Sequence, residues 1–113
     1  MVVVVFRSRS HEDVNLEELS VLYERMYALV STMPGFIGVK DFQAEDGEAV
    51  SIAEFDTLEH VAAWREHSEH QAAQERGRKE FFKEYSTQVC TVMRDSHFPS
   101  TVATKREAHE ATE

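Results

Sequence analysis

The chain has 113 residues, a formal net charge of −9 and 42% hydrophobic residues, which predicts one small acidic domain with enough apolar side chains for a core. Its negative charge argues against binding to a nucleic-acid backbone, which requires a basic surface. Cys90 is the only cysteine, so an internal disulfide and a metal site built from several thiolates are excluded.

The N-terminal run Val2–Phe6 is continuously apolar and β-branched, which is typical of a strand covered on both faces. It is too short for a signal-peptide core or a membrane span. We therefore expect a soluble, cytoplasmic protein that does not bind membranes.

A first helix is predicted from about Leu16 to Met33. Asn15 precedes it and Glu18 follows three positions later, as in a capping box. Pro34-Gly35 ends it. Apolar residues recur at helical spacing along it: Leu16, Leu19, Leu22, Tyr23, Met26, Leu29, Val30 and Met33.

Two strands should follow, Phe36–Phe42 and Val50–Phe55, joined by a hairpin turn at Asp46-Gly47. Thr57, with Asp56 before it, is suited to cap a second helix.

The second helix is expected to break near His67, because Ser68 offers another cap. The restarted helix is predicted to carry residues spaced four apart and to end in an aromatic group. These residues are Ala73, Gly77, Phe81 and Tyr85, with Phe82 adjacent.

A last strand is predicted at Ser86–Arg94, and Cys90 within it is expected to be a buried, inert thiol. Residues 96–113 are polar, carry charges of both signs and lack an apolar period. We predict a domain over residues 1–95 and a disordered tail over residues 96–113.

The element order is β-α-β-β-α-β, which predicts a ferredoxin-like α+β fold with a four-stranded antiparallel sheet and helices on one face. Apolar residues lie on both faces of the first and last predicted strands, but the helices cover only one face. A bare apolar face is unusual on a soluble monomer. We therefore expect a homodimer formed through the open sheet face.

Several segments resemble the antibiotic biosynthesis monooxygenase (ABM) family of the dimeric α+β barrel superfamily. They are Met33-Pro34-Gly35-Phe36 between the first helix and the second strand, Glu54-Phe55 at the end of the third strand, and Trp64 with His67 and His70. The resemblance covers about residues 1–95. It implies a pocket between the sheet and the helices, and either cofactor-free oxygenation of aromatic phenols and quinols or haem degradation.

The haem-degrading branch resembles this chain at Trp64, which would pack on a porphyrin. That branch places an axial histidine ten positions later, where this chain has Gln74, and an asparagine where this chain has Phe6 before Arg7. We therefore expect no cofactor, and keep haem bound through His70 as the alternative.

Within such a pocket, His70 is the candidate general base and His67 the second candidate, since imidazole titrates near neutral pH. The candidate substrate-binding residues are Trp64, Gln74, Phe82, Tyr27 and Arg7. Tyr23 is assigned to the core stripe of the first helix. No metal site is expected, because the two histidines lack a third ligand.

The leading hypothesis is a homodimeric, cofactor-free monooxygenase that oxidises an aromatic or quinol-like small molecule. The alternatives are a haem-binding or haem-degrading protein, a non-catalytic dimer that binds a small molecule, and a structural dimer whose pocket is filled by its own side chains.

Overall fold

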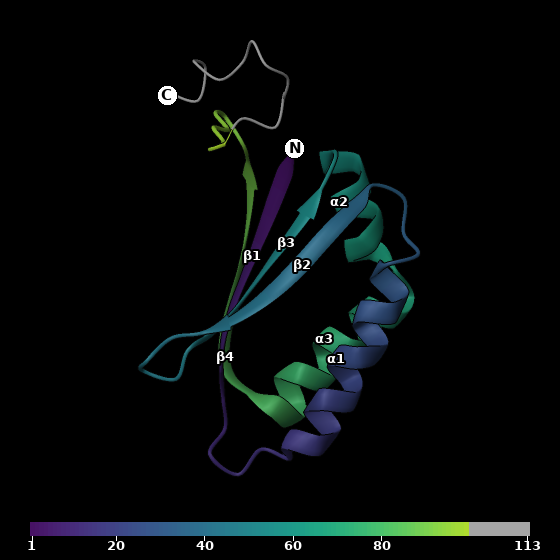
Figure 1. Ribbon diagram of the computed structural model, residues 1–113. Helices are drawn as coiled ribbons and strands as arrows, with labels where there is room; N and C mark the ends of the chain where they lie inside the picture. Colours follow the sequence, from purple (N-terminus) through teal and green to yellow (C-terminus); the bar gives the residue numbers. More distant parts are fainter. Residues whose placement is uncertain (100–113) are drawn as a thin grey trace.

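The computed structural model describes residues 1–99, and it has the predicted ferredoxin-like α+β architecture (Figure 1). Three helices and one short helical turn accompany four strands. In chain order the elements are β1 (Val2–Ser10), α1 (Leu16–Val30), β2 (Phe36–Gln43), β3 (Ala49–Phe55), α2 (Leu58–Glu66), α3 (Ser68–Arg76), a π-helical turn (Gly77–Phe81) and β4 (Phe82–Thr91).

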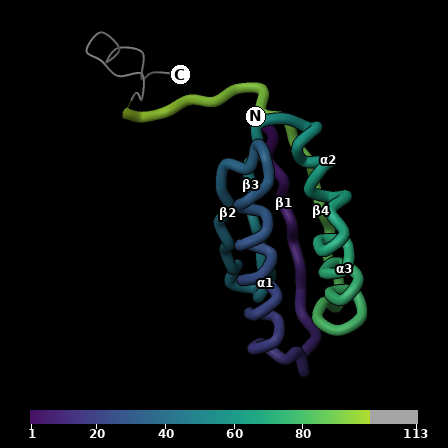
Figure 2. The backbone as a smooth tube through the Cα atoms, turned by 90° about the vertical axis from the view of Figure 1, so that its right-hand side faces the viewer, coloured from purple at the N-terminus to yellow at the C-terminus, as the bar shows by residue number. Residues whose placement is uncertain are grey.

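The four strands form one antiparallel sheet in the order β2-β3-β1-β4. All three helices lie on the same face of this sheet (Figure 1). Figure 2 shows α1 in front of β2 and β3, and α2 and α3 in front of β4. The central strand β1 runs between these two groups of helices.

The start of α1 confirms the predicted capping box. The Glu18 backbone N–H donates to Asn15 Oδ1 at 3.1 Å, and Asn15 Nδ2 donates to the Glu18 carboxylate at 3.2 Å. The helix ends at Val30 rather than Met33. The hydroxyls of Ser31 and Thr32 donate to backbone carbonyls of the last turn and help to close it.

The predicted break of the second helix is also confirmed, but its cap is His67 rather than Ser68. His67 has extended backbone dihedrals between α2 and α3. Its Nδ1 accepts the Glu69 backbone N–H at 3.2 Å. An imidazole nitrogen therefore accepts the hydrogen bond that a hydroxyl or carboxylate oxygen usually accepts at a helix N-cap.

The prediction of a continuous helix to Tyr85 is wrong. The α-helix stops at Arg76, the chain makes one π-helical turn, and Phe82 already begins β4. Phe81 is almost fully buried, with the Arg76 guanidinium 4.9 Å from its ring centroid. Burial of this ring and pairing with β1 therefore outweigh the helical spacing of the sequence.

The largest buried cluster lies at one end of the layer between helices and sheet. It joins β1, α1, β3 and α2 through Val2, Val30, Phe55 and Val61. Ion pairs connect α1 to α3 farther along, from Arg25 to Glu69 at 2.7 Å and from Arg76 to Glu18 at 2.8 Å.

The two faces of β3 differ in side-chain size. Phe55 is buried under the helices, so every second residue back from it faces the helices: Ala53, Ser51 and Ala49. The alternate residues Glu54, Ile52 and Val50 face away from the helices. Apart from Phe55, the covered face of β3 therefore carries small side chains, and the uncovered face carries large ones.

The uncovered face is a partly apolar surface. It has a hollow of about 340 Å³ lined by Gly38, Val39, Lys40, Phe42, Ile52 and Glu54. Phe42 is 52% exposed. Cys90 pairs with Val3 on this face and is exposed, so the prediction of a buried thiol is wrong for this chain.

Gly35 offers a test of the link between α1 and β2. Its φ is +81°, and a Cβ there would collide with Asp56 and His60, whose side chains are hydrogen-bonded at 2.6 Å. Gly35→Ala is expected to lower the free energy of unfolding by about 2–4 kcal/mol. Denaturant titration followed by circular dichroism measures this.

Gly47→Ala is the matched control. Gly47 also has positive φ, +92°, but no atom lies within 4 Å of an added Cβ. Gly47→Ala should lower the free energy of unfolding by about 1 kcal/mol, because only the backbone conformation is disfavoured and no atoms collide. Equal losses for the two variants would contradict a steric role of the Asp56–His60 pair.

In the described part of the chain, residues 1–99, no helix is long and apolar enough to cross a membrane. The tail predicted from Ser96 falls mostly on residues 100–113, outside the described residues. The domain boundary at residue 95 thus stays a prediction.

Candidate functional site

His70 stacks on Trp64 at the inner side of α3. The two ring centroids are 4.1 Å apart and the planes are inclined by 13°. His70 Nδ1 lies 3.1 Å from the backbone carbonyl oxygen of Trp64. Because a carbonyl only accepts, Nδ1 carries the hydrogen, and the neutral ring keeps its lone pair on Nε2.

The surroundings of His70 favour its neutral form. Burial lowers the pKa of His70 below its ordinary value of 6.5, the bond to the Trp64 carbonyl opposes this, and the nearby His67 lowers it further. At neutral pH this imidazole is therefore an uncharged base with one free nitrogen.

His67 is placed differently, although its ring centroid is only 5.8 Å from that of Trp64. Its Nδ1 accepts the first free N–H of α3, which uses the lone pair of the neutral ring. Of the two histidines predicted as bases, His70 is the one whose lone pair is not engaged by the helix.

The sheet side of the same layer carries three aromatic rings near the π-helical turn. The ring centroid of Phe6 lies 5.7 Å from that of Phe82 and 5.3 Å from that of Tyr85. A Cβ on Gly77 would lie 2.8 Å from the Phe82 ring, so only glycine lets the turn pack on it. Arg78 donates to the Tyr85 hydroxyl at 2.8 Å.

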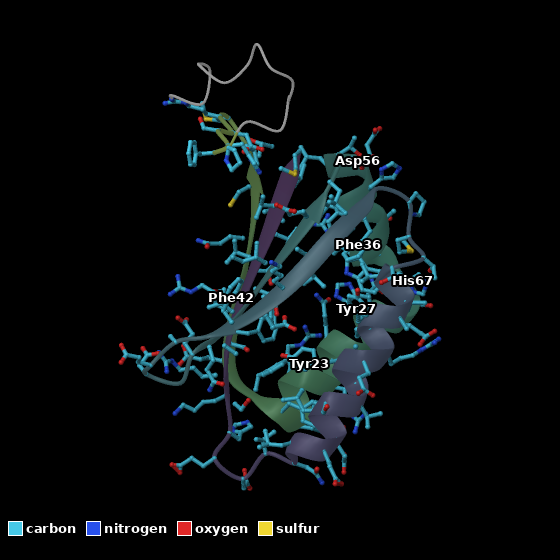
Figure 3. All side chains as sticks on the ribbon, in the orientation of Figure 1. Tyr23, Tyr27, Phe36, Phe42, Asp56 and His67 are labelled. Carbon is cyan, nitrogen blue, oxygen red and sulfur yellow. The ribbon has the colours of Figure 1, made fainter. Side chains whose placement is uncertain are left out.

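Side chains in the middle of this layer stay partly exposed. Val4 and Phe6 face the helices from the central strand, yet neither is fully buried. Tyr23 and Tyr27 lie on the side of α1 towards the sheet (Figure 3) and are 40% and 57% exposed. These four side chains therefore remain partly accessible to solvent.

The remaining predicted residues divide between the two faces of the sheet. Gln74 is half-buried on α3, one turn after His70. Arg7 alternates with Phe6 and lies on the uncovered face, where it forms a two-pronged ion pair with Glu48 at 3.0 and 3.1 Å. Arg7 is therefore apart from Trp64, Phe82 and the histidines.

Sequence reasoning missed a group of polar side chains under α1, which we call the interlayer polar cluster. It consists of Ser8, Tyr23, Asp41 and Ser51. The buried Ser8 lies near the side chain of Tyr23, and the Ser51 hydroxyl donates to Asp41 at 2.5 Å. Tyr23, assigned to the core by its spacing, thus contacts a polar group. Polar residues at alternate strand positions were the available signal.

The family model described as antibiotic biosynthesis monooxygenase, ABM, matches residues 1–76. The chain belongs to the ABM family. It is also 35% identical over 96 residues to the uncharacterized protein YqjZ of Bacillus subtilis, covering 84% of this chain and 82% of that protein.

Solved structures similar to this ABM chain share its fold at low sequence identity. Rv0793 from Mycobacterium tuberculosis has a TM-score of 0.73 and 14% identity, covering 85% of this chain and 98% of that one. SnoaB, a cofactor-independent oxygenase from Streptomyces nogalater, has a TM-score of 0.71 and 17% identity, covering 88% and 97%. A dimeric ferredoxin-like protein of unknown function from Thermobifida fusca has a TM-score of 0.65 and 12% identity, covering 80% and 90%.

The candidate site offers few groups for a metal. Among residues 1–99 no cluster of three or more His, Cys, Asp or Glu side chains is arranged to hold an ion. A porphyrin does not fit between Trp64 and His70, because those rings are already in contact.

The lowered pKa of His70 predicts a loss of stability of this ABM domain in acid. As pH falls through 6.5 the unfolded chain binds a proton at His70 before the folded chain does, so the free energy of unfolding decreases until the folded pKa is passed. His70→Gln should show a shallower decrease over the same range. Denaturant titrations between pH 7 and pH 5 measure the slope, and equal slopes would contradict the prediction.

Proposed function

We propose that this ABM protein is a cofactor-free monooxygenase that oxidises flat phenols or quinols in the layer between sheet and helices. The observation that carries the proposal is the His70–Trp64 pair. A neutral imidazole with a free Nε2 stacks on an indole, and side chains such as Phe6 and Tyr27 between sheet and helices stay partly exposed. The similarity in fold to SnoaB, a cofactor-independent oxygenase, supports it.

In the proposed reaction His70 accepts the phenolic proton. The resulting phenolate is electron-rich enough to reduce dioxygen itself, so the protein has to bind, deprotonate and orient the substrate and exclude water. One oxygen atom enters the ring as a carbonyl. The other leaves as water with two hydrogens of the substrate, and the ring becomes a quinone.

The roles of the other residues follow from their positions. Trp64 and Phe82 provide aromatic surfaces for packing on a flat substrate. Gln74, one turn from His70, would orient a polar group of the substrate, and Tyr27 would offer its hydroxyl from α1. Arg7 takes no part in this proposal, because it lies on the other face of the sheet.

The proposal is tested with a naphthalene diol that carries one hydroxyl on each ring. Protein prepared without haem should consume oxygen and form the hydroxynaphthoquinone in equal amounts, at a rate proportional to protein concentration. Added chelator should not slow it. Binding of the diol without any oxygen uptake would instead favour the non-catalytic binding dimer.

Haem binding is the second candidate, and one observation favours it. A metal-ligating histidine commonly donates its other ring N–H to a carbonyl, as His70 does to Trp64. A haemin titration separates the candidates, since a saturable, sharpened Soret band that His70→Ala abolishes would favour haem.

We also propose that the protein is a homodimer through the uncovered sheet face. The large side chains of β3 face that side, and Phe42 and Cys90 are exposed there. A patch of this kind on a single chain is typical of a protein–protein interface. The similar fold of a dimeric ferredoxin-like protein supports the proposal.

A further inference from the structure

The interlayer polar cluster lies where a helix-covered sheet normally carries apolar side chains. Strand pairing places Ser51 directly between Asp41 and Phe6 on the helix-facing side. Ser8 is the next helix-facing residue of β1 after Phe6, and the Tyr23 side chain of α1 lies near it. Polar groups from three strands and one helix thus meet beneath α1, which Figure 2 shows in front of β2 and β3.

Asp41 is the charged member of this cluster, and its charge is not balanced by a side-chain cation in the described ion pairs. The ion pairs among residues 1–99 engage other carboxylates: Glu18, Asp46, Glu48, Asp56, Glu69, Glu75 and Glu80. The Ser51 hydroxyl occupies one acceptor position of the carboxylate. The other lone pairs are free to accept a hydroxyl hydrogen from a ligand.

Tyr23 adds a neutral hydroxyl to the cluster. Burial raises the pKa of Tyr23 above its ordinary value, and the nearby Asp41 raises it further. The phenol therefore keeps its hydrogen at neutral pH. Together with Ser8 and Ser51 it gives the cluster three uncharged hydrogen-bonding groups, while the Asp41 carboxylate, held by Ser51, is exposed to solvent.

We propose that the interlayer polar cluster binds a hydroxyl at the far end of the substrate from His70, and that Asp41 is a specificity-determining residue that rejects anionic ligands. The inference rests on the proposed function for the placement of the reacting hydroxyl at His70. It narrows the substrate class to flat aromatics with hydroxyls at both ends and no carboxylate. Repulsion from Asp41 also directs the ionised oxygen of the substrate towards His70.

Three bicyclic probes test the inference. They are the naphthalene diol with one hydroxyl on each ring, the naphthol that lacks the second hydroxyl, and the hydroxynaphthoate that has a carboxylate in its place. Affinities are measured by isothermal titration calorimetry without oxygen, so that the result does not depend on turnover. The full chain should bind the diol at least about 10-fold more tightly than either other probe.

Asp41→Asn should reduce the preference for the diol over the carboxylate to within about threefold, by tightening carboxylate binding and weakening diol binding. Asp41→Glu keeps the charge and should keep the rejection of the carboxylate. Glu45→Gln, which removes a charge from the exposed hairpin turn, should leave all three affinities unchanged.

Each outcome has a distinct meaning. Equal affinities of the unaltered protein for the diol and the carboxylate, no binding of any probe, or an unchanged preference in Asp41→Asn would overturn the inference. A diol preference that depends on Asp41, without oxygen uptake, would support the inference and contradict the proposed oxygenase. Oxygen uptake without this diol preference would support the proposed oxygenase and contradict the inference about Asp41.

Discussion

His70→Ala is expected to lower the rate of phenol oxidation by about 100-fold or more, the usual contribution of a general base. The variant loses the nitrogen that is free to take the phenolic proton, while Trp64 and the sheet remain in place. Oxygen uptake at saturating diol measures the effect, and light scattering should show that the oligomeric state is unchanged. An activity equal to that of the unaltered protein would remove His70 from the mechanism.

The pH dependence of the unaltered protein gives an independent sign. His70 acts as a base only when it is unprotonated, so kcat/KM, which reports the free protein, should rise with pH along an acid limb. Because burial lowers the pKa of this histidine, the midpoint of that limb should lie below 6.5. A midpoint above that value would contradict the assignment.

His67 supplies the control for His70. His67→Asn keeps a side-chain acceptor for the Glu69 N–H, so it should retain both stability and activity. His67→Ala should lose about 1 kcal/mol of the free energy of unfolding with the α3 cap. Loss of turnover in His67→Asn at unchanged stability would transfer the role of base to His67.

Ile52→Asp is expected to weaken the proposed homodimer by about 100-fold or more, because it places a charge in the apolar part of the uncovered face. Ile52 lines the hollow on that face, beside Gly38 and Phe42. Size-exclusion chromatography with light scattering should give twice the chain mass for the unaltered protein at micromolar concentration. The variant should give the mass of one chain.

The control removes an exposed apolar side chain elsewhere. Leu16 is 69% exposed at the first turn of α1, far from the uncovered face, and an acidic residue is tolerated at a helix N-terminus. Leu16→Asp should therefore leave the dimer intact. A dimer that survives Ile52→Asp, or dissociates equally in Leu16→Asp, would contradict assembly through the sheet face.

Much of the fold was predictable because its signals are local. Asn15 with Glu18 marked the start of α1, and Gly47 with positive φ confirmed the hairpin. The segment after Gly77 was not predictable in the same way. Residues spaced four apart suit a helix, and only the pairing of β4 with β1 shows that Phe82 belongs to a strand.

The candidate site was predicted in its residue types more than in its geometry. Trp64 and His70 were chosen together, but their direct stacking depends on the break at His67. Alternation along β1 was enough to predict the face on which Arg7 lies, because Arg7 shares a side of the strand with Val3 and Val5.

Asp41 was missed because its face depends on the length of one turn. A two-residue turn at Asp46-Gly47 would pair Asp41 with Ile52, on the uncovered side. The observed hairpin closes with Ala44 opposite Glu48, and this shift by one residue pairs Asp41 with Ser51. Such a shift turns every side chain of a strand over, and composition alone does not reveal it.

The unequal faces of β3 have a consequence for how this protein can change. Small residues on one side would set how much room the proposed substrate has, and large ones on the other form the proposed contact between subunits. Ala53 packs against the buried cluster, so the change has to come at Ala49. If the proposed function holds, a larger side chain at Ala49 is expected to alter ligand size preference without touching assembly. Residues on the two faces of β3 can therefore change independently of one another. A change in substrate preference would not require a change in the proposed dimer contact.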